Sequence, residues 1–197
     1  HTTIVTFEIN VAPGEYPAVG VLWRESGRAW EITNVLGLYT DPENLAPKTV
    51  VVEENQPFDE EINILADMSL TRRSAFIEGE LRFEGEWPDD TEILALASFP
   101  IVPRPDNPFD FLTLQSLDIA VPLFRTEPYR FRTRVPAGTH KFLALFWKGK
   151  TGGLLDIRAI GFYNCDDNPR QPRFVTVGEN ETATNVNFTV DLESLPS

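Results

Sequence analysis

"VPAGTHKFLALFW" at residues 135–147 and "VAPGEYPAVGVLW" at residues 11–23 share a valine, a glycine and a tryptophan at the same spacing. The three shared residues keep a constant displacement of 124 positions: Val11 and Val135, Gly14 and Gly138, Trp23 and Trp147. Each stretch reads as a turn and then an apolar strand, whose tryptophan can fill the space between two sheets. The pair therefore predicts one fold unit in two copies.

The similarity continues beyond these stretches. Gly37 and Tyr39 follow Trp23 at the same spacing as Gly161 and Tyr163 follow Trp147. Each copy then has a loop of Asp, Asn and Pro, a β-branched strand, and a strand that ends in Asp, with insertions of one residue. We expect Gly14 and Gly138 to adopt positive φ in turns. Gly37 and Gly161 should lie where another backbone approaches closely.

Segments rich in β-branched and aromatic residues, several with alternating polarity, recur along the whole chain and predict strands. The predicted strands are residues 2–11, 48–52, 75–85, 92–99, 129–135, 141–147 and 185–192. The 16 prolines and 12 glycines argue against long helices, and a short helical turn at 109–117 is the exception. The pattern predicts an all-β fold of two tandem antiparallel β-sandwich units, prealbumin-like or Ig-like.

The two units are unequal in length. We assign residues 1–72 to a first, partial unit and residues 73–197 to a second, with a loop insert at about 100–115. Residues 74–124 have no counterpart ahead of Thr2, so the first unit lacks its opening strands. Three explanations stand open: a smaller sandwich, upstream strands missing from this sequence, or strands supplied by another molecule. We expect His1 to mark a processing or cloning boundary.

Charge and cysteine content exclude several classes of function. The net charge is −13 and the pI about 4.5, which disfavours a nucleic-acid partner. The sequence contains no apolar run of about 18 residues and does not open on a signal-peptide pattern. Cys165 is the only cysteine, so neither an intrachain disulfide nor a cysteine-based zinc site can form.

Three segments carry a family resemblance. They are VPAGTH (135–140), SAFIEGELRFEGE (74–86) with Ile77, Gly79 and Leu81, and FVTVGENETATNVNFTVDL (174–192). Together they resemble transthyretin-like (prealbumin-like) or carboxypeptidase-regulatory-like β-sandwich repeats of secreted bacterial proteins. The resemblance covers the second unit throughout and the first from about residue 2 to 70, and the insert at 100–115 departs from the commonest pattern of these families. It implies accessory modules, often on lipoproteins or appended to enzymes, and it supplies no catalytic residues.

The two histidines are the strongest candidates for catalysis. An N-terminal histidine with a second imidazole resembles the copper centre of lytic polysaccharide monooxygenases. The repeat argues against it, because His140 occupies the position of Tyr16, where an aromatic ring serves packing. His140 is also the only plausible base of a triad, and no GxSxG motif occurs. Carboxylates are numerous, but no pair of glycosidase type stands out. We therefore predict no enzymatic activity.

Two equivalent loops could supply oxygen ligands to calcium. The candidates are Asp41 and Glu43, with Asn44, and Asp166 and Asp167, with Asn168. Asx turns beside proline explain the same residues without a metal. Two further alternatives concern the surface: Asn180 and Asn187 match the glycosylation sequon, and four aromatics could form a recognition surface or pack against the protein. These four are Trp30, Trp87, Phe109 and Phe111.

Taken together, these features predict an exported, non-enzymatic structural or assembly module, extracellular, on the cell surface or periplasmic. We expect it to bind a protein partner, or to self-associate into a filament or complex, by β-augmentation at its sheet edges. A lipid anchor outside this chain would tether it to a membrane. We expect no cofactor other than calcium. A carbohydrate-binding accessory module is the alternative, and a copper or hydrolytic enzyme is the third.

Overall fold

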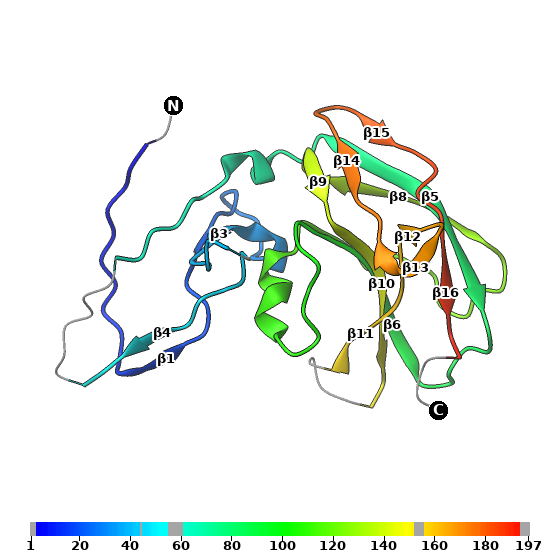
Figure 1. Cartoon of the computed structure of the whole chain (residues 1–197), viewed down its shortest axis with the longest axis horizontal. Helices are drawn as coiled ribbons and strands as arrows, with labels where there is room; N and C mark the ends of the chain where they lie inside the picture. The colour runs from blue at the N-terminus through cyan, green and yellow to red at the C-terminus, as the bar shows by residue number, and fades with distance from the viewer. Residues whose placement is uncertain (1–2, 44, 55–60, 152–155, 194–197) are drawn as a thin grey trace.

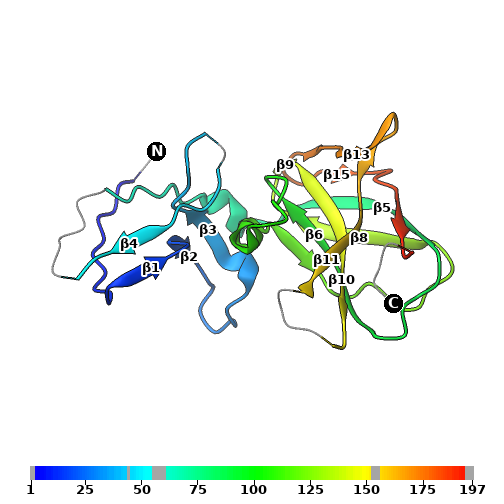
Figure 2. The same ribbon diagram turned by 60° about the horizontal axis from the view of Figure 1, so that its bottom comes forward.

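The computed structural model describes residues 3–43, 45–54, 61–151 and 156–193. Almost all of its regular structure is β-strand, which confirms the all-β class. Figures 1 and 2 show two parts side by side, with residues 3–72 on one side and the second unit on the other. Among the described residues, no helix is long and apolar enough to cross a membrane.

The second unit contains two four-stranded sheets. One has the order β11-β10-β6-β7, and in the other β5 pairs with β8 on one edge and with β15 and β16 on the other edge. The strands are β5 (Ala75–Glu84), β6 (Thr91–Phe99), β7 (Ser116–Asp118), β8 (Tyr129–Val135), β10 (Phe142–Gly149), β11 (Arg158–Phe162), β15 (Thr182–Ala183) and β16 (Phe188–Asp191).

One core lies between these two sheets. Alternate residues of β5 and β8 point into it, and so do residues of β10 from the other sheet. Ile77, Leu81, Leu143 and Leu145 are fully buried there. The period-two alternation seen in the sequence has this cause, since successive side chains of a strand point to opposite faces.

Shorter elements complete the second unit. Three-residue β9 (Gly138–His140) pairs with β14 (Val175–Val177), and β12 (Asn164–Cys165) forms a hairpin with β13 (Asn168–Pro172). In the insert, the 3₁₀-helix η3 (Pro108–Thr113) agrees with the predicted helical turn. Its Asp110 is fully buried and accepts hydrogen bonds from the Arg104 side chain and backbone at 2.9 Å.

The insert packs against the body of the second unit. Phe111 contacts Phe99 and Phe146 with ring centroids 5.5 and 5.3 Å apart. Trp87 packs on Phe83 and donates a hydrogen bond to the Arg125 carbonyl. Phe111 and Trp87 therefore have packing roles.

The first unit is much smaller. It contains two antiparallel pairs, β1 (Gly14–Tyr16) with β4 (Val50–Val52) and β2 (Gly20–Leu22) with β3 (Val35–Leu38). The 3₁₀-helix η1 (Ile32–Asn34) precedes β3, and η2 (Met68–Thr71) leads into the second unit. Because these strands form two separate two-stranded ladders, the tandem arrangement of two sandwiches is not confirmed.

One predicted strand of the first unit does not form. Residues 3–11, within the segment predicted as a strand at 2–11, are in no strand of the structure. In Figure 1 they run as a free, dark blue segment at the far end of the first unit. The prediction rested on alternating polarity, which shows that a segment can become a strand but does not supply the neighbour that a strand requires.

Candidate functional site

The strand pairing of the first unit repeats that of the second. β1 pairs with β4 in the register in which β9 pairs with β14, so Tyr16 lies opposite Val50 as His140 lies opposite Val175. β2 and β3 match β10 and β11 in the same way, and both pairs carry a bulge at the equivalent place. The repeat seen in the sequence is thus a repeat of strand pairing.

The glycines that the two units share have equivalent surroundings. A Cβ at Gly37 would lie 2.2 Å from the Leu65 carbonyl oxygen, and one at Gly161 would lie 2.9 Å from the carbonyl oxygen of Thr189. Leu65 and Thr189 are themselves 124 positions apart, so in each unit the equivalent backbone segment approaches the equivalent glycine. Both predictions of close backbone approach are confirmed. Gly14 and Gly138 have the predicted positive φ, 158° and 141°, but each is the first residue of a short strand, β1 or β9.

His140 and Tyr16 make equivalent hydrogen bonds. The Tyr16 hydroxyl donates to the Ala12 carbonyl at 2.6 Å, and His140 Nε2 lies 3.1 Å from the Pro136 carbonyl oxygen, four residues back in both cases. His140 is fully buried, and its Nδ1 lies 3.1 Å from Ser98 Oγ. The packing role predicted for His140 is confirmed. His1 lies outside the described residues.

His140 also makes the stability of the fold depend on pH. Burial lowers its pKa below the usual value, and the hydrogen bond to Pro136 offsets this only in part. The unfolded chain therefore binds a proton that the folded chain excludes, so stability falls as pH drops below about 6.5. We expect His140→Gln to remove this part of the pH dependence, measured by urea unfolding between about pH 5 and 8. An identical pH profile in the variant would contradict the prediction.

The first candidate site is the unpaired segment 3–11. Shifted by 124 positions, Val5, Phe7 and Ile9 correspond to residues of β8 that point into the core. In the first unit they are 78%, 47% and 64% exposed. No backbone hydrogen bond joins residues 3–11 to another part of the chain that the structure describes. This segment has the alternating apolar and polar residues of a strand that faces a core, but its apolar side chains are exposed.

Residues 61–67 form the other half of this site. They correspond to β16 and the residues before it, and the Asp67 backbone N–H donates to the Leu36 carbonyl at 2.9 Å. In the second unit, β5 lies between β8 and β16, antiparallel to the first and parallel to the second. Within the described part of the first unit, no strand takes the place of β5. We call residues 3–11 together with 61–67 the acceptor edge.

The other sheet of the first unit is also open. β10 pairs along its whole length with β6, and Trp147 donates a hydrogen bond to Thr91 Oγ1 of β6 at 3.0 Å. β2 has no such neighbour among the described residues. As a result, Trp147 is 4% exposed and its equivalent Trp23 is 41% exposed. Among its described residues, the first unit thus has no equivalent of β5 or of β6.

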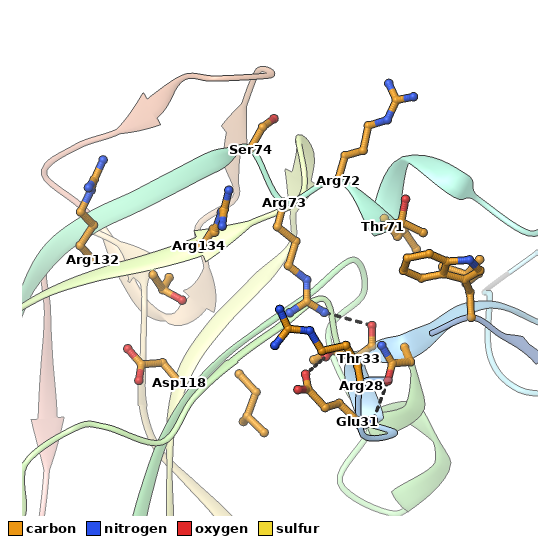
Figure 3. Close-up of a pocket in the computed structure, with 16 residues that line it drawn as sticks. Arg28, Glu31, Thr33, Thr71, Arg72, Arg73, Ser74, Asp118, Arg132 and Arg134 are labelled. Atoms are coloured by element: carbon orange, nitrogen blue, oxygen red, sulfur yellow. Dashed lines mark hydrogen bonds between the residues drawn. The ribbon is translucent and has the colours of Figure 1, made fainter. Parts of the chain in front are cut away.

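The second candidate site is a groove of about 860 Å³ between the two units. Five arginines line it: Arg28, Arg72, Arg73, Arg132 and Arg134. In Figure 3, Arg73 reaches from the junction of the units toward the first unit, where its guanidinium donates to the Thr33 carbonyl at 3.0 Å. Burial lowers the pKa of Arg73, although not enough to remove its charge at neutral pH. We call this site the arginine groove.

The arginine groove is not evident from the sequence. Arg72 and Arg73 are adjacent in sequence, whereas Arg132 and Arg134 lie about sixty residues later on β8. The β5–β8 ladder brings the two pairs together, because Phe76 at the start of β5 lies opposite Arg134. The available signal was the alternation of arginines along 130–134, whose apolar neighbours place all three on the solvent face.

The calcium candidates lie in two separate loops, one in each unit. Asp41 Oδ1 accepts a hydrogen bond from the Glu43 backbone N–H at 2.8 Å, and Asn168 Oδ1 accepts one from Arg170 at 3.2 Å. Both are Asx turns that span a proline, as the sequence allowed. Asp166 pairs with Arg173 at 3.2 Å.

No side-chain cluster with metal-ligand composition was found among the described residues. Asp167 lies beside Asp166 in the β12–β13 hairpin, and Asn44 lies outside the described residues. Calcium binding at either loop stays a prediction.

Comparisons with known proteins add little to this geometry. No family model matches the chain, and no curated protein matches it significantly. One solved structure, a leucine-rich repeat protein from Bacteroides thetaiotaomicron, matches over 80% of this chain and 19% of its own length. Its identity is 10% and its TM-score 0.25, and a likeness of that size carries no argument about fold or function.

Proposed function

We propose that this chain is an exported, non-enzymatic assembly module whose first unit accepts a β-strand from a protein partner or a second copy. The supporting observation is the acceptor edge, two extended segments whose equivalents in the second unit flank β5. An edge of apolar, unpaired strand is costly to leave open in water and is a template for strand addition. A surface or periplasmic location, with a lipid anchor outside this chain, suits such a subunit.

The second unit defines what the incoming strand must look like. Gly79 lies opposite Phe131 of β8, and a Cβ there would lie 1.8 Å from the Val186 carbonyl oxygen. The equivalents in the first unit are Phe7 and Ile62. The partner strand therefore needs a glycine where it passes between Phe7 and Ile62, with apolar residues two positions before and after it.

The partner strand also has a defined direction. It runs antiparallel to residues 3–11 and parallel to 61–67, as β5 does to β8 and β16. Asn187 accepts a hydrogen bond from the Glu80 backbone N–H at 2.9 Å, and Asn63 occupies the equivalent position beside the acceptor edge. Side-chain and backbone groups are thus both in place to receive the strand. Burial of Val5, Phe7 and Ile9 would supply the main driving force.

A peptide with the sequence of residues 74–85, SAFIEGELRFEG, tests the proposal directly. We expect it to bind the protein and to protect the amides of residues 3–11 and 61–67 from hydrogen exchange. The same peptide with Gly79→Val should bind at least about tenfold more weakly, because its side chain would meet the carbonyl of Ile62.

Two results would count against this function. One is a monodisperse monomer in which residues 3–11 are already protected without any peptide. The other is equal binding of the glycine and valine peptides, which would show that the peptide binds nonspecifically to an apolar surface and does not add as a strand.

A further inference from the structure

The arginine groove concentrates positive charge on an acidic protein. The chain has a net charge of −13, yet five arginines and only two carboxylates, Glu31 and Asp118, line this groove. Charges more than about 8 Å apart are largely screened at physiological ionic strength. A ligand in the groove therefore experiences the positive field of the nearby arginines more strongly than the field of the chain's net negative charge.

The arginines differ in how far their charge is already compensated. Arg132 pairs with Glu78 of β5 at 2.7 Å, and Arg28 with Glu25 at 3.7 Å. Within the described parts of the chain, Arg72 and Arg134 are paired with no carboxylate. Arg134 lies on the exposed face of β8, and Arg72 is exposed beside η2. Two guanidinium groups are thus available to an incoming anion.

Polar groups of other kinds also line the groove. Thr71, Ser74 and Thr133 contribute hydroxyls to the lining, and Glu31 and Asp118 contribute carboxylates. Asp118 uses Oδ1 to accept from the Ala120 backbone N–H, which leaves Oδ2 without a hydrogen-bond partner among the described residues. Carboxylates accept hydrogen bonds from hydroxyl groups, and arginines bind carboxylate or sulfate in a bidentate manner.

We propose that the arginine groove binds an anionic oligosaccharide, one whose rings carry carboxylate or sulfate groups beside free hydroxyls. Arg72 and Arg134 bind the anionic groups, and Asp118 accepts from sugar hydroxyls. An acidic peptide fits less well, since it offers few hydroxyls to donate to Glu31 and Asp118. A neutral sugar would leave the arginines without a counterion. The groove belongs to both units and no residue of the acceptor edge lines it, so the proposal does not depend on strand addition.

Calorimetric titration of the whole chain tests this with matched probes. A short oligogalacturonate supplies carboxylates, a chondroitin sulfate oligosaccharide supplies sulfates as well, and a cello-oligosaccharide is the neutral control. We expect binding of one or both anionic probes, weakened by added salt, and no binding of the neutral one. Arg72→Gln and Arg134→Gln should each weaken binding about tenfold.

Arg170→Gln is the matched control variant, because Arg170 is exposed on β13 and outside the groove. It removes the same charge and should leave the affinity unchanged. The proposal is overturned if neither anionic oligosaccharide binds, or if a poly-glutamate peptide or inorganic sulfate binds as tightly. It is also overturned if the Arg170 variant loses as much affinity as the groove variants. The salt dependence and the competition by each probe on the unaltered protein decide the question even where a variant fails to fold.

Discussion

Gly79→Ala is expected to lower the free energy of unfolding of the second unit by about 3 kcal/mol or more. The added methyl group would lie 1.8 Å from the Val186 carbonyl oxygen and 2.9 Å from Phe131 Cε1. Neither contact can relax cheaply. β5 is held by ladder hydrogen bonds to β8 on one side and to β16 on the other, so moving its backbone breaks one set or the other.

Gly37→Ala provides the matched control for this substitution. Its methyl group would lie 2.2 Å from the Leu65 carbonyl, which is also a severe overlap. Residues 61–66, however, make no backbone hydrogen bond to another described segment, so they can move away. We expect a cost of about 1 kcal/mol or less. Urea unfolding, followed by hydrogen exchange at the β5 amides and at the β3 amides, measures the stability of each unit separately. Equal costs would show that residues 61–67 are as firmly held as β16.

The contrast between the two glycines shows what the sequence could predict. The positions of Gly37 and Gly161, and of Tyr16 and His140, keep one displacement, and the pairing registers follow it, apart from one residue inserted before β14. A turn glycine, a core tryptophan and a bulge are local requirements, so two copies with the same local sequence adopt the same pairing. This part of the fold can therefore be predicted from the sequence.

The open part of the first unit could not be predicted in the same way. Residues 3–11 alternate apolar and polar side chains as β8 does, and the sequence alone makes them a strand. Whether the strand forms depends on a neighbour far away in the sequence, which is β5 for β8 and no described segment for residues 3–11. Polarity patterns report which face of a segment is apolar, and they do not report whether a partner exists.

The arginine groove was hidden for a related reason. Four of its five arginines come from the junction at 72–73 and from β8, and only the antiparallel β5–β8 ladder makes these four neighbours. The net charge of −13 argues against anion binding. A net charge describes the long-range field of the molecule, whereas a binding groove responds to the few charges within a Debye length.

Trp147→Ala is expected to destabilise the second unit by about 3–5 kcal/mol, because it opens a large cavity in a core that cannot collapse. Trp147 is almost fully buried among residues of both sheets, and its indole N–H donates to Thr91 Oγ1. The substitution removes the side chain and also leaves the Thr91 hydroxyl with one partner fewer. Urea unfolding monitored by hydrogen exchange at the β10 amides measures the loss.

Trp23→Ala makes the same change at the equivalent position of the first unit, and its expected cost is about 1 kcal/mol or less when no strand is added. Trp23 is partly exposed, since no described strand takes the place that β6 has beside β10. The cost should rise once the peptide of residues 74–85 is bound, because Trp147 packs in one core with Ile77 and Leu81 of β5, and the peptide brings the same two side chains to the first unit. Peptide affinity should fall in the Trp23→Ala variant for the same reason, by about tenfold. If Trp23→Ala costs as much as Trp147→Ala in the protein alone, the first unit already has a complete core and has no need of a partner strand.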